Sequence, residues 1–237
     1  MFRQSIFKNQ AGEGQLRGTE VRRIEAFSDA VFAFAVTLLI VSLEVPKNFD
    51  ELIATIRGFF AFGISFALLM SIWYEQNLFF RRYGLDDIIT IVLNCTLIFL
   101  VLFYVYPLKF LFTLLLDKQL FEGANTSPAI GVQNVPTLME IYGAGFISIY
   151  FLFYLMYLHA KRKRHELNLI SEELFDTRTR IYKCFVFMSV GAFSVILAWL
   201  LPPGMAGFSG FAYFLIGPGL TVLFSYRTKR KNKLFRR

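Results

Sequence analysis

The stretch IEAFSDAVFAFAVTLLIVSLEV, residues 24–45, is an apolar run whose only charged side chains are Glu25, Asp29 and Glu44. A helix of this length rises about 33 Å, enough to cross the roughly 30 Å hydrocarbon core of a bilayer. Five further apolar runs follow along the chain, at residues 52–73, 88–115, 138–158, 184–201 and 206–226. The pattern predicts an all-α, polytopic membrane protein with six transmembrane helices.

Composition indicates that lipid is the solvent of most of this chain. Of its 237 residues, 56% are hydrophobic, and the mean hydropathy is +0.52. A soluble domain of this size could not bury that much apolar surface. The net charge of +8 lies at the ends of the apolar runs, which is typical of a topology signal rather than of a nucleic-acid surface. We therefore expect the lipid bilayer, and no nucleic acid, as a partner.

The basic residues predict the orientation. An even number of spans puts both termini on one side, and all but four of the 25 basic residues then fall in segments on that side. The exceptions are Lys47, Arg57, Lys109 and Lys118. Because positive charge concentrates in cytoplasmic segments, we predict cytoplasmic termini and a multi-pass protein of the cell membrane, in a bacterium the inner membrane.

The same charges divide the chain into regions. Residues 1–22 form a polar N-terminal arm, residues 23–226 the six-helix domain, and residues 227–237 a basic tail whose charge suits anionic lipid. Residues 161–183 form a cytoplasmic loop within the domain. Its part 166–183 interleaves apolar and charged residues, which predicts either an extension of the fifth helix or a helix lying at the membrane interface.

Motifs typical of enzymes are absent from the sequence. It holds no Gly-x-Ser-x-Gly elbow, no phosphate-binding Gly-Lys loop and no His-Glu-x-x-His pair. Cys95 and Cys184 lie in apolar runs, and His159 and His165 lie in or beside a basic stretch, so the histidines and cysteines never cluster at metal-ligand spacing. We expect no catalytic residue, no metal site and no cofactor, and we interpret the chain as something other than an enzyme.

The first apolar run carries the residues of most functional interest. An ionisable side chain within a membrane helix, such as Asp29, is a functional-site hypothesis, and the alternative is a purely structural bond between helices. Glu44, near the outer end, would concentrate cations at a pore mouth or serve as an ordinary interfacial carboxylate. At 100° per residue two stripes appear, one of large apolar side chains and one of small ones that lets helices approach closely. The first comprises Phe27, Phe34, Leu38, Val41 and Val45, and the second Ala26, Ala30, Ala33 and Thr37.

The pattern Arg23-x-x-x-Phe27-Ser28-Asp29, followed by the apolar run 30–39, resembles the first-helix signature of the transmembrane-protein-175 channels. These are the endolysosomal potassium channel and its bacterial relatives. The resemblance extends to the six-helix layout with cytoplasmic termini. It implies a potassium-permeable channel with passive conduction, built as a homotetramer whose first helix lines the pore, with K⁺ as the permeant ion.

The resemblance also implies roles for single residues. Phe34, Leu38 and Val41 match an apolar constriction, and Thr37 matches a position whose hydroxyl ring contacts the permeating ion. The matching polar network, which holds the first helix against its neighbours, comprises Arg23, Phe27, Ser28, Asp29, Trp73 and Gln76. Two positions depart from the family pattern. Phe34 stands where isoleucine or leucine is usual, and Gln76, which cannot titrate, stands near a position that is often histidine.

Two other functions remain open from the sequence. A secondary transporter would place a substrate site at the midplane between broken helices, and breaks are expected at Pro107 and at Ile216-Gly217-Pro218-Gly219, although the two lie at different depths. A proton-permeable variant of the channel is the other. The sequence lacks the Thr-Val-Gly-Tyr-Gly filter, so any potassium selectivity should be modest.

Overall fold

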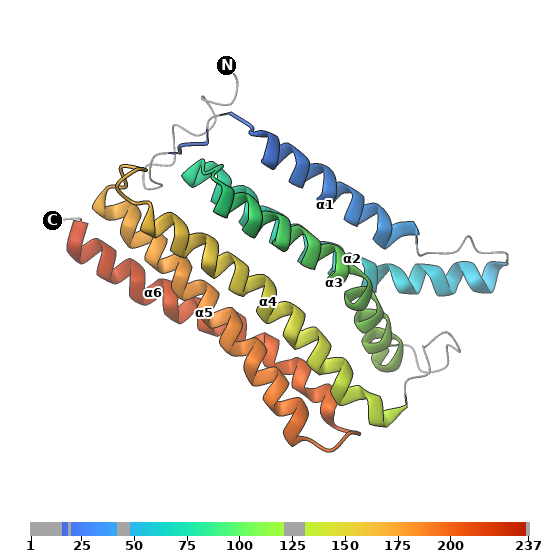
Figure 1. The fold of residues 1–237 in the computed structure, drawn as a ribbon. Coiled ribbons are helices and arrows are strands. Elements are labelled where there is room, and N and C mark those ends of the chain that lie inside the picture. The colour runs from blue at the N-terminus through green and yellow to red at the C-terminus, as the bar shows by residue number, and fades with distance from the viewer. Residues whose placement is uncertain (1–15, 19, 42–47, 121–130, 236–237) are drawn as a thin grey trace.

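The computed structural model describes residues 16–18, 20–41, 48–120 and 131–235. It is a bundle of long helices (Figure 1). Its elements are α1 (Arg23–Val41), α2 (Phe49–Tyr83), α3 (Ile88–Leu120), the 3-10 turn η1 (Val132–Asn134), α4 (Val135–Arg162), α5 (Ser171–Leu200), the 3-10 helix η2 (Ala206–Leu215) and α6 (Ile216–Phe235). Within these ranges there is no strand, so the all-α prediction is confirmed.

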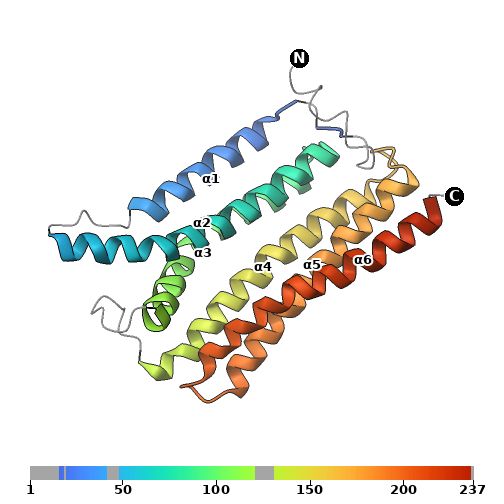
Figure 2. The ribbon, with the colours of Figure 1, turned by 180° about the vertical axis from the view of Figure 1, so that it is seen from behind.

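The helices pack as two halves. In one half, α1, α2 and α3 contact one another. In the other half, α5 and η2 contact each other and both α4 and α6, and α3 against α4 is the main junction between the halves. The two views place α1 at one edge of the bundle and α6 at the opposite edge (Figures 1 and 2). Aromatic rings fill the junction between α2 and α4, where Phe79 packs against Tyr83 and Tyr157, all three fully buried.

Length and composition identify membrane spans among these helices. Within the described residues, four segments are long and apolar enough to cross a bilayer: Ile88–Val105, Val135–Arg162, Ser171–Leu200 and Ala206–Phe235. α1 carries Arg23, Glu25 and Asp29 in its first two turns. The chain is therefore an all-α membrane protein, and its described residues form six α-helices, with at least four candidate spans among them.

Three helices extend beyond the apolar runs predicted for them. α2 continues ten residues beyond Trp73 to Tyr83, because Phe79, Phe80 and Tyr83 lie on one face and are buried in the core. The segment 166–183 belongs mostly to α5, which begins at Ser171, so the first of the two alternatives for it holds. α6 ends at Phe235, so the helix continues into the segment predicted as a basic tail.

The two proline breaks differ from each other. Pro107 lies inside α3 without ending it, and the Tyr142 hydroxyl donates a hydrogen bond to the Pro107 carbonyl. The last predicted span does change character, since 3-10 helix gives way to α-helix at Ile216, directly before Gly217 and Pro218. Only one helix is thus interrupted within the described ranges, so the paired broken helices of a transporter are not present there.

Charged side chains tie the halves together where α1 begins and α6 ends. The Arg17 guanidinium lies 2.7 Å from the buried carboxylate of Glu173 on α5. In the turn before α3, Asp87 contacts His159 Nε2 at 2.8 Å. Burial alone would raise the pKa of Asp87, but hydrogen bonds from Thr90 and His159, with the charges of His159 and Lys163, lower it below its ordinary value. The Asp87 carboxylate is therefore charged at neutral pH.

Candidate functional site

A buried chain of hydrogen bonds links α1, α2 and α3. Asn94 of α3, fully buried, donates its amide to Ser28 Oγ of α1 at 2.8 Å. Its oxygen accepts a hydrogen bond from Gln76 Nε2 of α2 at 2.6 Å. The Ser28 hydroxyl in turn donates to the Ile24 carbonyl at 2.7 Å. Because every polar atom in an apolar interior needs a partner, this chain fixes the rotation of α1 against its two neighbours.

Asp29 makes a separate bond to α2. The Trp73 indole Nε1 donates to Asp29 Oδ1 at 2.7 Å, at an exposed position. Since Asp29 follows Ser28 by 100° around the helix, Ser28 turns toward α3 while Asp29 turns toward α2. Two successive residues of α1 thus fasten it to two different helices, and Asp29 stands at the border between the packed face and the open face of α1.

Of the residues predicted for a polar network, the structure links Ser28 to Gln76 through Asn94 and, by a separate bond, Asp29 to Trp73. Arg23 and Phe27 lie elsewhere: both are exposed on α1. Sequence reasoning missed Asn94, which joins Ser28 to Gln76. A signal existed, because Asn94 is the only Asn or Gln in the apolar run 88–115.

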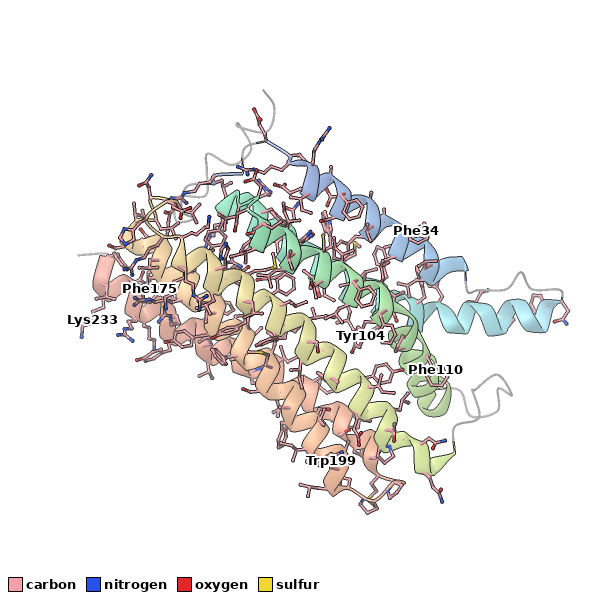
Figure 3. All side chains as sticks on the ribbon, in the orientation of Figure 1. Phe34, Tyr104, Phe110, Phe175, Trp199 and Lys233 are labelled. Carbon is pink, nitrogen blue, oxygen red and sulfur yellow. The ribbon has the colours of Figure 1, made fainter. Side chains whose placement is uncertain are left out.

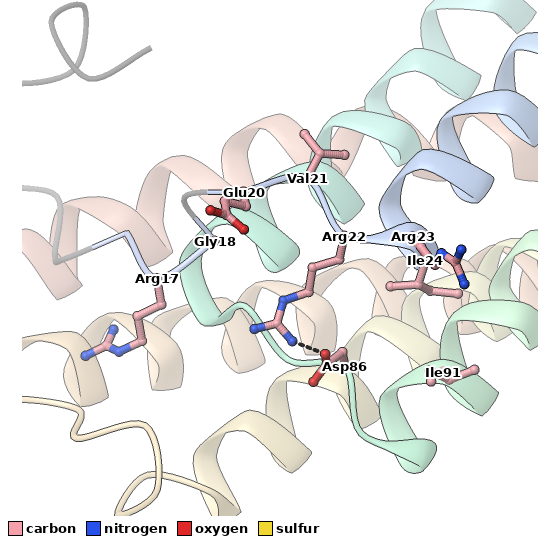
Figure 4. A pocket seen from close by; sticks show the side chains of 9 residues that line it. All are labelled: Arg17, Gly18, Glu20, Val21, Arg22, Arg23, Ile24, Asp86 and Ile91. Carbon is pink, nitrogen blue, oxygen red and sulfur yellow. Dashed lines mark ion pairs between the residues drawn. The ribbon is translucent and has the colours of Figure 1, made fainter. Parts of the chain in front are cut away.

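Arg23 borders a cavity at the start of α1. The cavity has a volume of about 550 Å³ and is lined by residues from the N-terminal arm, the first turn of α1 and the α2–α3 turn. Figure 4 shows Arg22 paired with Asp86 across it, while the Arg23 side chain lies beside Ile24. Arg23 therefore occupies the hydrated end of the helix, where it can snorkel toward water, instead of joining the buried network.

The opposite face of α1 is open. Phe34 is 57% exposed and Phe27 55% exposed, and Figure 3 marks Phe34 on α1 at the edge of the bundle. Leu38 is half-buried. The small stripe predicted beside them, Ala26, Ala30, Ala33 and Thr37, is exposed throughout.

The packed face of α1 carries Phe32, Ala35 and Leu39, each at most 2% exposed. The side chain of Val41 and the whole of Glu44 lie outside the described residues. α1 therefore presents to its surroundings a continuous surface that combines large rings with small residues, and α2 and α3 leave that surface uncovered.

A second buried polar cluster connects the two halves of the bundle. Glu75, next to Gln76 on α2, is 6% exposed. Its carboxylate lies 2.5 Å from Lys183 Nζ and accepts a hydrogen bond from the Tyr157 hydroxyl at 2.7 Å. Arg180 lies 3.5 Å away. Adjacent residues of α2 therefore reach in two directions, Gln76 toward α1 and α3, and Glu75 toward α4 and α5.

Metal-ligating side chains do not gather in the part of the chain that the structure describes. It holds no group of three or more His, Cys, Asp or Glu residues arranged to bind an ion. Cys95 is exposed, Cys184 is buried, and both are free thiols. The chemistry available at the α1 network is therefore hydrogen bonding and positioning.

Replacing Asn94 with leucine should destabilise the protein measurably. The change removes the acceptor of the buried Gln76 amide and the donor to Ser28, and stranded buried polar groups cost about 1–3 kcal/mol. We expect the melting temperature in detergent, followed by intrinsic fluorescence, to fall by about 5 °C. Thr96→Val is the matched control on the same helix, since Thr96 is exposed and bonds only its own turn. Equal melting temperatures for the two variants would contradict the role of Asn94.

Residues 23–107 match the family model described as the endosomal/lysosomal potassium channel TMEM175. The matched range contains α1, α2 and the start of α3, with all the residues of the hydrogen-bonded network. Among curated proteins, a potassium channel of Marivirga tractuosa is 39% identical to this chain over 228 residues, which cover 92% of this chain and 91% of that protein.

Two solved structures are similar to this fold. A crystal structure of a variant of the potassium channel MtTMEM175, in complex with a nanobody–MBP fusion protein, has a TM-score of 0.79 at 39% identity and covers 91% of this chain and 97% of that one. A TMEM175 homologue from Chamaesiphon minutus has a TM-score of 0.53 at 24% identity and covers 89% of this chain and 97% of that one. The second likeness concerns the fold alone.

Proposed function

Because the chain belongs to the TMEM175 family, we propose that it is a potassium channel that conducts ions passively through a pore lined by α1. The open face of α1 carries this proposal. The bonds of Ser28 and Asp29 hold α1 in a fixed rotation. In that rotation Phe27 and Phe34 are exposed, so this side of α1 is available for contacts with groups outside the chain. Potassium is the proposed ion because the similar proteins are described as potassium channels.

A pore lined by α1 needs more than one copy of this helix, and the proposed assembly is the homotetramer that the family resemblance implies. The stripe of Ala26, Ala30, Ala33 and Thr37 lets four such helices approach one another closely. Phe34, Leu38 and Val41 would then meet around the axis as an apolar constriction, and such a ring can close a pore by excluding water. Glu44, outside the described residues, would lie at the outer mouth.

Thr37 is the proposed ion-contacting residue. Its hydroxyl donates to the Phe34 carbonyl at 2.7 Å, so the hydroxyl proton is held by the backbone. The oxygen lone pairs remain free to face a cation. A ring of four hydroxyl oxygens replaces only part of a hydration shell, which agrees with modest selectivity for potassium.

The network residues position the pore helix in this proposal. Ser28, Asp29, Trp73 and Gln76 keep the open face of α1 toward the axis, and Arg23 lies at the hydrated end. Positive charge on the loops favours cytoplasmic termini in the membrane of a bacterial cell. The positive charge of Arg81, Arg82 and the segment 161–183 agrees with that orientation.

Purified protein in liposomes should let potassium run down its gradient without any coupling ion. The measurement is a flux assay with a potassium gradient, repeated without sodium and with the pH equal on both sides. Flux that requires sodium, or an imposed proton gradient, would contradict passive conduction. Light scattering of the protein purified in detergent should give the mass of four chains. The mass of one chain would contradict the proposal, because a monomer cannot enclose a pore with one α1.

A further inference from the structure

The last turns of α6 carry a stripe of cations that the described part of the chain leaves uncovered. Two basic residues of this segment face α5. Arg227, 7% exposed, bonds Thr179 Oγ1 and the Phe175 carbonyl, both at 2.9 Å, and stacks 3.7 Å above the Phe175 ring. One turn on, Lys231 lies 3.0 Å from Asp176 and 2.9 Å from Glu172. These contacts fix the rotation of the helix end.

That rotation turns the other cations outward. At 100° per residue, Lys229 and Lys233 lie opposite the side that holds Arg227 and Lys231, and Arg230 lies at the edge between the two sides. All three are exposed. Sequence positions 201–237 contain no Asp or Glu. The outward cations therefore have no acidic neighbour on their own helix, and Lys231 engages Glu172 and Asp176 of α5.

Along the outward side of α6, the exposed side chains change from apolar to aromatic to basic toward the end of the helix. Val222, 71% exposed, is followed by Tyr226, 62% exposed, and then by Lys229 and Lys233. These four positions fall within a narrow arc of the helix. An apolar residue, an aromatic residue and then cations match acyl chain, interface and headgroup in that order. In the described structure α6 contacts α5 and η2, and this face points away from both.

We propose that this outward face, defined by Tyr226, Lys229, Arg230 and Lys233, binds the headgroup of an anionic phospholipid. The charge of the face is complementary to a phosphodiester, and the exposed apolar turn before it accommodates the acyl chains. Arg227 and Lys231 position the site, since the hydrogen bonds and stacking of Arg227 and the ion pairs of Lys231 hold α6 at the required rotation. The position at the bundle edge opposite α1 (Figures 1 and 2) leaves the face free for lipid.

Native mass spectrometry of the detergent-purified protein tests the proposal. Wild-type protein titrated with dioleoylphosphatidylglycerol should retain bound lipid at concentrations where dioleoylphosphatidylcholine leaves none. The variant K229Q/R230Q/K233Q should lose this preference, with an affinity for the anionic lipid at least about tenfold lower, because each cation near an anionic surface contributes severalfold. The arginine-for-lysine variant K229R/K233R should keep it.

The matched control K161Q/R162Q/R164Q removes three cations from the end of α4 and the following turn, where the nearest preceding aromatic residues are not exposed: Tyr157 is fully buried and Tyr154 is half-buried. It should retain the wild-type preference. Equal losses in both triple variants, or an unchanged preference in K229Q/R230Q/K233Q, would overturn the proposal in favour of general electrostatics. Displacement of the lipid by millimolar inorganic phosphate would also overturn it, since the site would then recognise a soluble anion.

Discussion

Potassium flux through liposomes that contain the Phe34→Ala variant is expected to exceed wild-type flux several-fold. Phe34 is 57% exposed on the open face of α1, one turn before Leu38. In a pore lined by four copies of α1, four phenyl rings would meet at one level and exclude water from it. Alanine removes each ring, so the level can fill with water and a hydrated cation no longer meets a dry barrier.

Leu38→Ala should act in the same direction with a smaller effect. Leu38 is half-buried at the flank of the open face, and its side chain is smaller than a phenyl ring. The double variant should conduct at least as well as Phe34→Ala. Comparing the potassium flux of the two single variants tests whether Phe34 or Leu38 forms the narrower ring.

Phe99→Ala is the matched control for the pore residues. Phe99 of α3 is 67% exposed, so its removal changes lipid contact to a similar degree without touching α1. Wild-type flux is expected for it. If Phe34→Ala and Leu38→Ala both conduct like the wild type while Phe99→Ala does too, α1 does not line the pore, and the assignment of the constriction fails.

The sequence could show which side chains of α1 share a face, because an α-helix has a regular 100° rotation per residue. Projection at 100° per residue grouped Phe27, Phe34 and Leu38 on one stripe, and the structure leaves Phe27 and Phe34 exposed. The end of α2 was not accessible in the same way. Charged residues after Trp73 suggested departure from the membrane, whereas Glu75 and Arg82 are buried among partners from other helices.

The contacts that could not be predicted from the sequence join residues that are far apart along the chain. Asn94 bonds Ser28 across 66 positions, and Lys183 meets Glu75 across 108. No periodicity relates such residues, so a lone amide in an apolar run and an acid near a helix end had no visible counterpart. Lys183 was assigned to a cytoplasmic loop for its charge, yet α5 carries it into the core, where one carboxylate engages it.

Glu75→Gln is expected to give the largest loss of stability among the variants considered. Glu75 is the acid that Lys183 and Arg180 share, and all three lie in a poorly solvated junction. Removing one partner of a buried ion pair costs about 3–5 kcal/mol because it leaves uncompensated charge. The glutamine oxygen can still accept a hydrogen bond, so we expect about 3 kcal/mol and a melting temperature in detergent lower by about 10 °C.

The cluster holds one acid, Glu75, and two cations, Lys183 and Arg180, so we expect removal of the acid to lower the stability more than removal of one cation. Lys183→Gln removes one of two cations and leaves Glu75 paired with Arg180, so its melting temperature should fall less than that of Glu75→Gln. The variant with both changes should lose less than the two single losses added together, because removing both charges leaves one buried cation, not two. Such a shortfall measures the coupling between Glu75 and Lys183.

Glu166→Gln provides the control for charge removal as such. Glu166 pairs with Lys163 at 3.0 Å, but its side chain is 69% exposed, and exposed pairs contribute about 0–1 kcal/mol. A loss for Glu75→Gln no greater than for Glu166→Gln would mean that water reaches the cluster and screens it. In that case the two halves of the bundle would be held together by the aromatic packing of Phe79, Tyr83 and Tyr157, and charge at the junction would be dispensable for the fold.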